Sequence, residues 1–200
     1  MKISLKEKIK TKIKSYNENE VFTASDFVDV ADINTVWQTL ARLENANEIK
    51  RIMNGVYYCP VYSDLLNEYE APSPNHVANA IARKHGWTIA PSGNTALNQL
   101  GLSTQVSSKW SYISDGPYKK YKLHQVEIEF KHCSNKNISG LSYKTAMVIQ
   151  AIKTLGKDGI EEHDITKLKK ILSLSEKEKM LIEAKKSTSW IYDYIKKICQ

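Results

Sequence analysis

Residues 49–60, IKRIMNGVYYCP, decide the fold of the N-terminal part of this 200-residue chain. An Asn-Gly pair between two short apolar runs is the strongest short-range signal for a two-residue β-turn, in which both central residues take positive φ. We therefore expect Asn54 and Gly55 to form the tip of a hairpin. Because Ile49 and Ile52 are three residues apart instead of two, the pattern also predicts a bulge or a slipped register near the turn.

Three predicted helices precede this hairpin. Residues 3–16 carry apolar side chains at helical spacing. Thr23, followed three residues later by Asp26, is close to a capping box that would open a short second helix. Asp32 is a good N-cap for a third helix over residues 33–46. The order helix, helix, turn, helix, hairpin is typical of a winged helix-turn-helix.

The third helix has two distinct faces at 100° per residue. One face is apolar and includes Trp37, which we expect to be a core anchor, as we do Trp190. The opposite face carries no acid, and its side chains are predicted to contact DNA: Asn34, Thr35, Gln38, Thr39, Arg42 and Asn45. Asn and Gln can bond adenine in two places, and Arg can do the same with guanine.

The hairpin would lie along the neighbouring DNA backbone or minor groove as a wing. Its predicted contacts are Lys50, Arg51, Asn54 and Gly55. The alternative is that the same three-helix unit and hairpin form a surface for protein contact.

The remainder of the chain predicts an α+β domain. The stretch EAPSPN, within residues 61–75, indicates a linker. Three strand-like runs at residues 109–114, 118–123 and 126–131 predict a small, mostly antiparallel sheet. From about residue 142 to the end the pattern is helical, including a capping box expected at Ser175 and Glu178. We thus expect a DNA-binding domain at residues 1–60, the linker at 61–75, and an α+β domain with a helical tail at 76–200.

Composition narrows the class of protein. The net charge is +7, and residues 134–200 hold thirteen Lys and Arg against eight Asp and Glu. No run of about 18 apolar residues predicts a membrane span, and the basic N-terminus is too polar for a signal peptide, so we expect a cytoplasmic protein. Three well-separated cysteines favour neither a disulfide framework nor a paired-cysteine zinc site.

One segment in the C-terminal part could hold an anion. Ser92, Gly93 and Asn94 stand at a predicted helix start, where backbone N–H groups attract phosphate. The alternative is a strand-to-helix turn in which Ser92 or Asn94 acts as the cap. The segment lacks both the ending of a P-loop and the glycine spacing of a dinucleotide fold.

No chemistry beyond binding is predicted. His124, His132 and Cys133 have a spacing that matches no metal motif, and no serine lies in a nucleophile elbow. We therefore expect no catalytic residues, no metal and no cofactor.

Two sequence blocks carry a family resemblance. The first is SDFVDVADINTVWQTLARLENANEIKRIMNGVYYCP, and the second is IAPSGNTALNQLGLSTQVSSKWSYISDG. Together they resemble the bacterial AbiEi-type antitoxins, the antitoxin half of type IV abortive-infection toxin–antitoxin pairs, over about residues 20–133. That family usually has a proline after STQV, where this chain has Ser107.

The resemblance implies a non-catalytic transcriptional autorepressor that binds inverted repeats of double-stranded DNA in its own promoter. It also implies that the part after the linker opposes a nucleotidyltransferase-like toxin. Some members of the group have no toxin beside them, so the alternative is a solitary regulator or a protein-binding adaptor. Either a preformed dimer or two monomers assembling on DNA would meet an inverted repeat.

Overall fold

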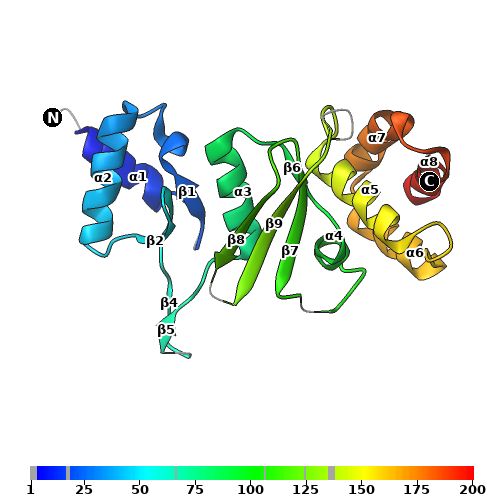
Figure 1. Cartoon of the computed structure of the whole chain (residues 1–200), viewed down its shortest axis with the longest axis horizontal. Coiled ribbons are helices and arrows are strands. Elements are labelled where there is room, and N and C mark those ends of the chain that lie inside the picture. Colours follow the sequence, from blue (N-terminus) through cyan, green and yellow to red (C-terminus); the bar gives the residue numbers. More distant parts are fainter. Residues whose placement is uncertain (1–3, 17–18, 66, 106, 124, 135–137) are drawn as a thin grey trace. The chain divides into compact units, whose positions relative to one another are not determined.

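The computed structural model describes residues 4–16, 19–65, 67–105, 107–123, 125–134 and 138–200. Contacts divide the chain into two compact units, Met1–Trp87 and Thr88–Gln200. The protein is an α+β protein in which each unit combines helices with a sheet (Figure 1). No helix in the described part of the chain is long and apolar enough to cross a membrane.

The first unit begins with the predicted helical segments. Helix α1 spans Leu5–Lys14, and the predicted first residue, Ile3, lies outside the described residues. Strand β1, Val21–Thr23, leads into η1, Ala24–Phe27, which is the short second helix expected and has 3₁₀ geometry. Its predicted Thr23–Asp26 capping box is confirmed.

Helix α2 spans Ile33–Asn45, close to the expected residues 33–46. Its predicted N-cap, Asp32, accepts a hydrogen bond from the backbone N–H of Thr35 at 3.0 Å. This bond satisfies one of the amides that a helix leaves unpaired at its start.

The predicted hairpin is present as β2, Lys50–Met53, and β3, Val56–Tyr58. The register shifts between Arg51 and Met53, which confirms the expected irregularity. In the three-stranded sheet, β3 lies between β1 and β2, and both pairings are antiparallel. The core beneath it joins residues of α1, η1, α2 and the sheet, including Ile9, Phe22, Phe27, Val36, Leu40 and Ile49.

The segment predicted as a linker contains a small hairpin of its own. Strands β4, Tyr62–Ser63, and β5, Glu68–Tyr69, pair antiparallel. Helix α3, Pro74–His85, follows and ends at Gly86, which has a positive φ of 68°. Because α3 contacts β1, β3 and η1, the contact division places it in the first unit, whereas the sequence analysis assigned residues 76–87 to the second domain.

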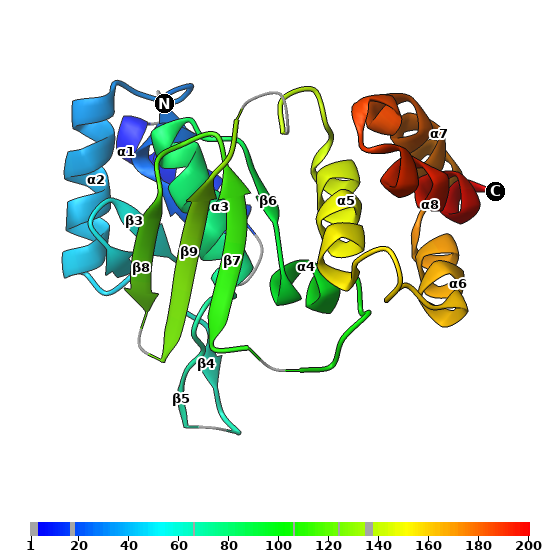
Figure 2. The same cartoon turned by 45° about the vertical axis from the view of Figure 1, so that its right-hand side comes forward.

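The second unit is built on a mixed four-stranded sheet with the order β6-β7-β9-β8. Strands β7, Lys109–Ser114, β8, Lys119–Leu123, and β9, Val126–His132, agree closely with the predicted runs. The pairs of β6, Ile89–Pro91, with β7 and of β8 with β9 are antiparallel, whereas β7 and β9 are parallel. Figure 2 shows β7, β9 and β8 side by side.

Helices complete the second unit. Short α4, Asn94–Gln99, follows β6, and α5, Tyr143–Leu155, contacts both α4 and β6. The tail continues with α6 (Glu162–Ile171), α7 (Leu174–Glu183) and α8 (Ser189–Cys199), which pack with α5 around one apolar core.

The expected capping box at Ser175 and Glu178 is wrong. The box that opens α7 is formed two residues earlier, by Ser173 and Glu176. Both pairs have the Ser-x-x-Glu spacing, so the sequence pattern alone does not distinguish them.

Candidate functional site

The exposed face of α2 is the strongest candidate for a functional surface in the first unit. Six residues of α2, spaced three or four apart so that they share one side of the helix, are exposed, and none is acidic: Asn34, Trp37, Gln38, Ala41, Arg42 and Asn45. Four of them were predicted as DNA contacts. The two additional members, Trp37 and Ala41, form an apolar strip along the polar face.

Trp37 is not the core anchor that the sequence predicted. Its side chain is 56 % exposed. The core is instead contacted by Val36, Leu40 and Leu43, with Thr39 beside them. The buried arc of α2 is therefore rotated by about 50°, half of one residue step, from the arc that hydrophobicity suggests.

The prediction that Thr39 contacts DNA is wrong, because its side chain is only 3 % exposed. Its hydroxyl donates to the backbone carbonyl of Thr35 at 2.8 Å. A β-branched threonine that bonds the carbonyl one turn earlier hides its polar group and packs like valine. That local bond lets Thr39 replace Trp37 on the buried side.

Thr35 belongs to the cap of the helix more than to its open face. Its hydroxyl donates to Asp32 Oδ2 at 2.5 Å, in addition to the backbone bond to the same carboxylate. The hydroxyl bond contributes most, and the backbone bond adds to it; together they lower the pKa of the exposed Asp32 carboxyl. A DNA contact by Thr35 would have to share this hydroxyl with the cap.

The tip of the β2–β3 hairpin differs from the expected turn. Of its two central residues only Gly55 has positive φ, at 72°, so the mirror-image turn with two positive values is wrong. A bulged hairpin can close with a single left-handed glycine. Lys84 of α3 donates to the carbonyl oxygen of Asn54 at 2.6 Å, and this bond ties the tip to the helix.

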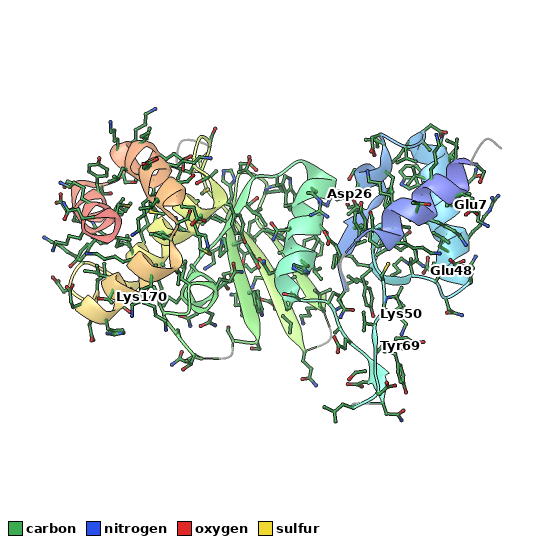
Figure 3. All side chains as sticks on the ribbon, turned by 180° about the vertical axis from the view of Figure 1, so that it is seen from behind. Glu7, Asp26, Glu48, Lys50, Tyr69 and Lys170 are labelled. Carbon is green, nitrogen blue, oxygen red and sulfur yellow. The ribbon has the colours of Figure 1, made fainter. Side chains whose placement is uncertain are left out.

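The two predicted wing cations already have partners. The Lys50 ammonium lies 3.4 Å from the ring centroid of Tyr69 in β5, and Figure 3 shows the two residues close together. Arg51 forms an ion pair with Glu44 of α2, with 3.0 Å between Nε and Oε1. Arg42 differs from both, since no ion pair among the described residues involves its guanidinium.

The turn at Ser92, Gly93 and Asn94 is a compact strand-to-helix connection. Gly93 occupies the N-cap position with a positive φ of 58°. Thr95 Oγ1 accepts from the backbone N–H of Ser111 at 2.8 Å, which fixes the turn to β7. Helix α4 has only six residues, too short to concentrate much charge at its start. Because Gly93 is the N-cap and no side chain bonds to the cap, the alternative in which Ser92 or Asn94 acts as the cap is wrong. The buried Ser92 Oγ has no hydrogen-bond partner among the described residues, and the anion site stays a prediction.

A second polar cluster lies on the sheet of the second unit, on the face opposite Ile128 and Phe130. Its centre is Glu129 of β9, which is 2 % exposed. Lys109 approaches this carboxylate at 2.8 Å, Lys120 at 3.4 Å, and Tyr118 donates a hydrogen bond to it. The sequence analysis missed this cluster because its members come from three strands.

No group of histidine, cysteine and acidic residues in the described ranges could hold a metal. His124, one member of the group considered from the sequence, lies outside these ranges.

Comparison with known protein families identifies the family of this chain. The chain belongs to a family of unknown function, DUF6088, whose model matches residues 8–180. The match spans both units and ends within α7. No curated protein matches the chain. The family description names no activity, so the resemblance to AbiEi-type antitoxins stays a prediction.

Sequence reasoning missed three contributors to the candidate surface. Trp37 and Ala41 share the i, i+3, i+4 spacing of Asn34, Gln38 and Arg42, and that spacing is the signal that could have found them. Lys84, by contrast, reaches Asn54 from thirty residues away. No pattern of neighbouring residues in the sequence predicts a contact over this separation.

Proposed function

We propose that the first unit is a winged helix-turn-helix that binds double-stranded DNA. The order α1, β1, η1, α2, β2, β3 and the antiparallel arrangement with β3 between β1 and β2 support this assignment. In this proposal η1 and α2 are the helix-turn-helix, α2 is the recognition helix, and the β2–β3 hairpin is the wing.

The observation that carries the proposal is the exposed, acid-free face of α2. A B-form major groove admits one α-helix. Asn34 and Gln38 would bond adenine edges and Arg42 a guanine edge, since these are the pairings that side-chain geometry favours. Arg42 is the best placed, because its guanidinium is exposed and carries no ion pair with another described residue.

The wing would add contacts to the phosphate backbone. Lys50 and Arg51 would exchange their present partners, Tyr69 and Glu44, for phosphates. Such contacts between partly exposed side chains are individually weak, so exchanging them costs little free energy. Phosphate contacts position a protein on DNA and make its affinity salt-dependent.

The regulatory role rests on the resemblance of residues 20–133 to AbiEi-type antitoxins. The protein would repress its own promoter from the cytoplasm, without catalysis, by binding an inverted repeat. The second unit would oppose a nucleotidyltransferase-like toxin. A reading frame for such a toxin beside the gene would support this role, and its absence would favour a solitary regulator or adaptor.

A mobility shift with the gene's own upstream DNA tests the proposal. The shift is measured at two salt concentrations and against a scrambled competitor. We expect a sequence-specific, salt-sensitive complex. Arg42→Ala and Gln38→Ala should each weaken specific binding by about 1–3 kcal/mol. Lys50→Ala should weaken binding to every sequence and lower the salt dependence.

Lys170→Ala, which removes an exposed lysine of α6 in the other unit, is the matched control and should change neither value. A shift that the scrambled competitor abolishes equally would reduce the interaction to non-specific attraction. If specific binding survives Arg42→Ala and Gln38→Ala unchanged, α2 is not the recognition helix.

A further inference from the structure

An exposed indole borders the polar face of α2. Trp37 is 56 % exposed, and Ala41 follows it one turn later on the same strip. The buried residues of α2 lie on the other side of the helix, so the indole contributes little to the core of the unit. The indole therefore lies at one edge of the candidate binding face, where with Ala41 it offers apolar surface to a ligand of α2.

We infer that Trp37, with Ala41, packs against the C5-methyl groups of thymines in the DNA site. The inference rests on the proposed function and names the bases that this face reads. The thymine methyl is the apolar feature that the major groove displays, and apolar side chains recognise it by contact.

The neighbours of Trp37 fit this assignment. Asn34 and Gln38 flank the indole along the helix and carry the amides that bond adenine in two places. In an A·T pair the thymine methyl and the adenine edge lie in the same groove. An amide and an apolar surface side by side on α2 therefore match the two features that one or two successive A·T pairs present.

The charge of the face agrees with a nucleic-acid ligand more than with a protein. Its one ionised member is Arg42; the nearest acid of α2, Glu44, borders the strip of Trp37 and Ala41, is 26 % exposed, and is paired with Arg51. A protein partner that covered Trp37 would also bury the Arg42 guanidinium and would need a carboxylate to pair with it. DNA supplies both the apolar methyl and the acceptors for Arg42 in the same groove.

The experiment removes the methyl group from the DNA without changing its base pairing. A duplex is first selected from a random pool by the wild-type chain. Each thymine of that duplex is then replaced in turn by deoxyuridine, and affinity is measured by fluorescence anisotropy. We expect replacement at one or two thymines per half-site to weaken binding by about fourfold each, the effect of one buried methyl.

Variants connect this loss to the indole. Trp37→Ala should bind thymine and deoxyuridine duplexes equally while it still prefers the selected sequence over a scrambled one. Trp37→Phe, which keeps an aromatic ring, should retain part of the sensitivity. Leu174→Ala, which removes an exposed apolar side chain from α7, is the matched control and should behave as wild type.

Two outcomes overturn the inference, and they differ in what else they affect. If a duplex is selected but no deoxyuridine position weakens binding, or if Trp37→Ala keeps the sensitivity, Trp37 reads no methyl group and the proposed function stands. If no duplex is enriched, the proposed function fails as well, and the indole becomes a candidate contact for a protein partner.

Discussion

Replacing Glu129 by Gln should make the stability of the second unit lose part of its dependence on pH. Glu129 is buried on the sheet and receives a hydrogen bond from Tyr118, while Lys109 lies 2.8 Å away. Burial by itself raises the pKa of this carboxyl. The bonds from Lys109 and Tyr118 outweigh burial and lower the pKa from its usual 4.5 to about 2.

The magnitude follows from that difference. Each pKa unit corresponds to about 1.4 kcal/mol, so the lowered pKa corresponds to about 3 kcal/mol of stability at pH 7. The lysine partners are themselves about half exposed, with 44 % for Lys109 and 43 % for Lys120. Solvent screens such ion pairs, which reduces the expected loss in Glu129→Gln to about 2 kcal/mol.

The direction with pH is fixed by the sign of the pKa change. The folded state binds a proton less readily than the unfolded state does, so the ionised Glu129 stabilises the fold above pH 4.5. This contribution falls as the pH drops from about 5 towards 2. The wild type should therefore approach the stability of Glu129→Gln in acid, because the glutamine does not titrate.

Urea unfolding followed by circular dichroism from pH 7 to pH 3 measures both quantities. Glu127→Gln is the control: this glutamate is on the same strand and face, is more exposed, and lies 3.4 Å and 3.9 Å from Lys120 and Lys109. It should cost less than 1 kcal/mol. A loss below about 0.5 kcal/mol for Glu129→Gln, against the expected value of about 2 kcal/mol, or a loss that stays constant down to pH 3, would refute the conclusion that the ion cluster determines this stability.

Three further predictions concern the first unit. Gly55→Ala should destabilise this unit by about 1 kcal/mol, because alanine is strained at the φ of 72° that Gly55 adopts. Gly86→Ala, at a φ of 68°, is the control for this variant: it should lower the stability in thermal unfolding by a similar amount but leave DNA affinity unchanged. Arg83→Ala should cost about 1–2 kcal/mol, since the guanidinium binds Asp26 at 2.9 Å and 3.2 Å; an unchanged melting temperature would contradict this. Thr39→Val should leave DNA affinity within about twofold, because this side chain is buried; a large loss of affinity would restore it to the binding face.

Local patterns predicted most of the elements. Strand Lys109–Ser114 was predicted at its observed residues, and helix α2, Ile33–Asn45, was predicted to within one residue. The Asp32 cap and the Thr23–Asp26 box were also confirmed. The helix and the caps depend on bonds between residues three or four apart, and the strand shows its two-residue alternation, so the sequence displays both directly.

The same patterns failed where two local solutions were equally good. Ser173 and Ser175 both precede a glutamate by three residues, and only Ser173 caps a helix in the structure. The Asn54-Gly55 pair predicted a turn correctly but not its type, because the bulge in β2 changes the conformation that the turn must adopt.

By itself, then, the sequence determined the bounds of the main helices and of the central strands of the second sheet, and the polar residues exposed on α2. Only the tertiary structure decided which other side chains share the exposed face of α2 and which are already engaged. It buried Thr39, exposed Trp37, and placed Tyr69 and Glu44 against the wing cations. The physical reason is that helix periodicity is a local property, whereas the exact rotation of a helix and the partner of a charge depend on packing between segments far apart in the chain.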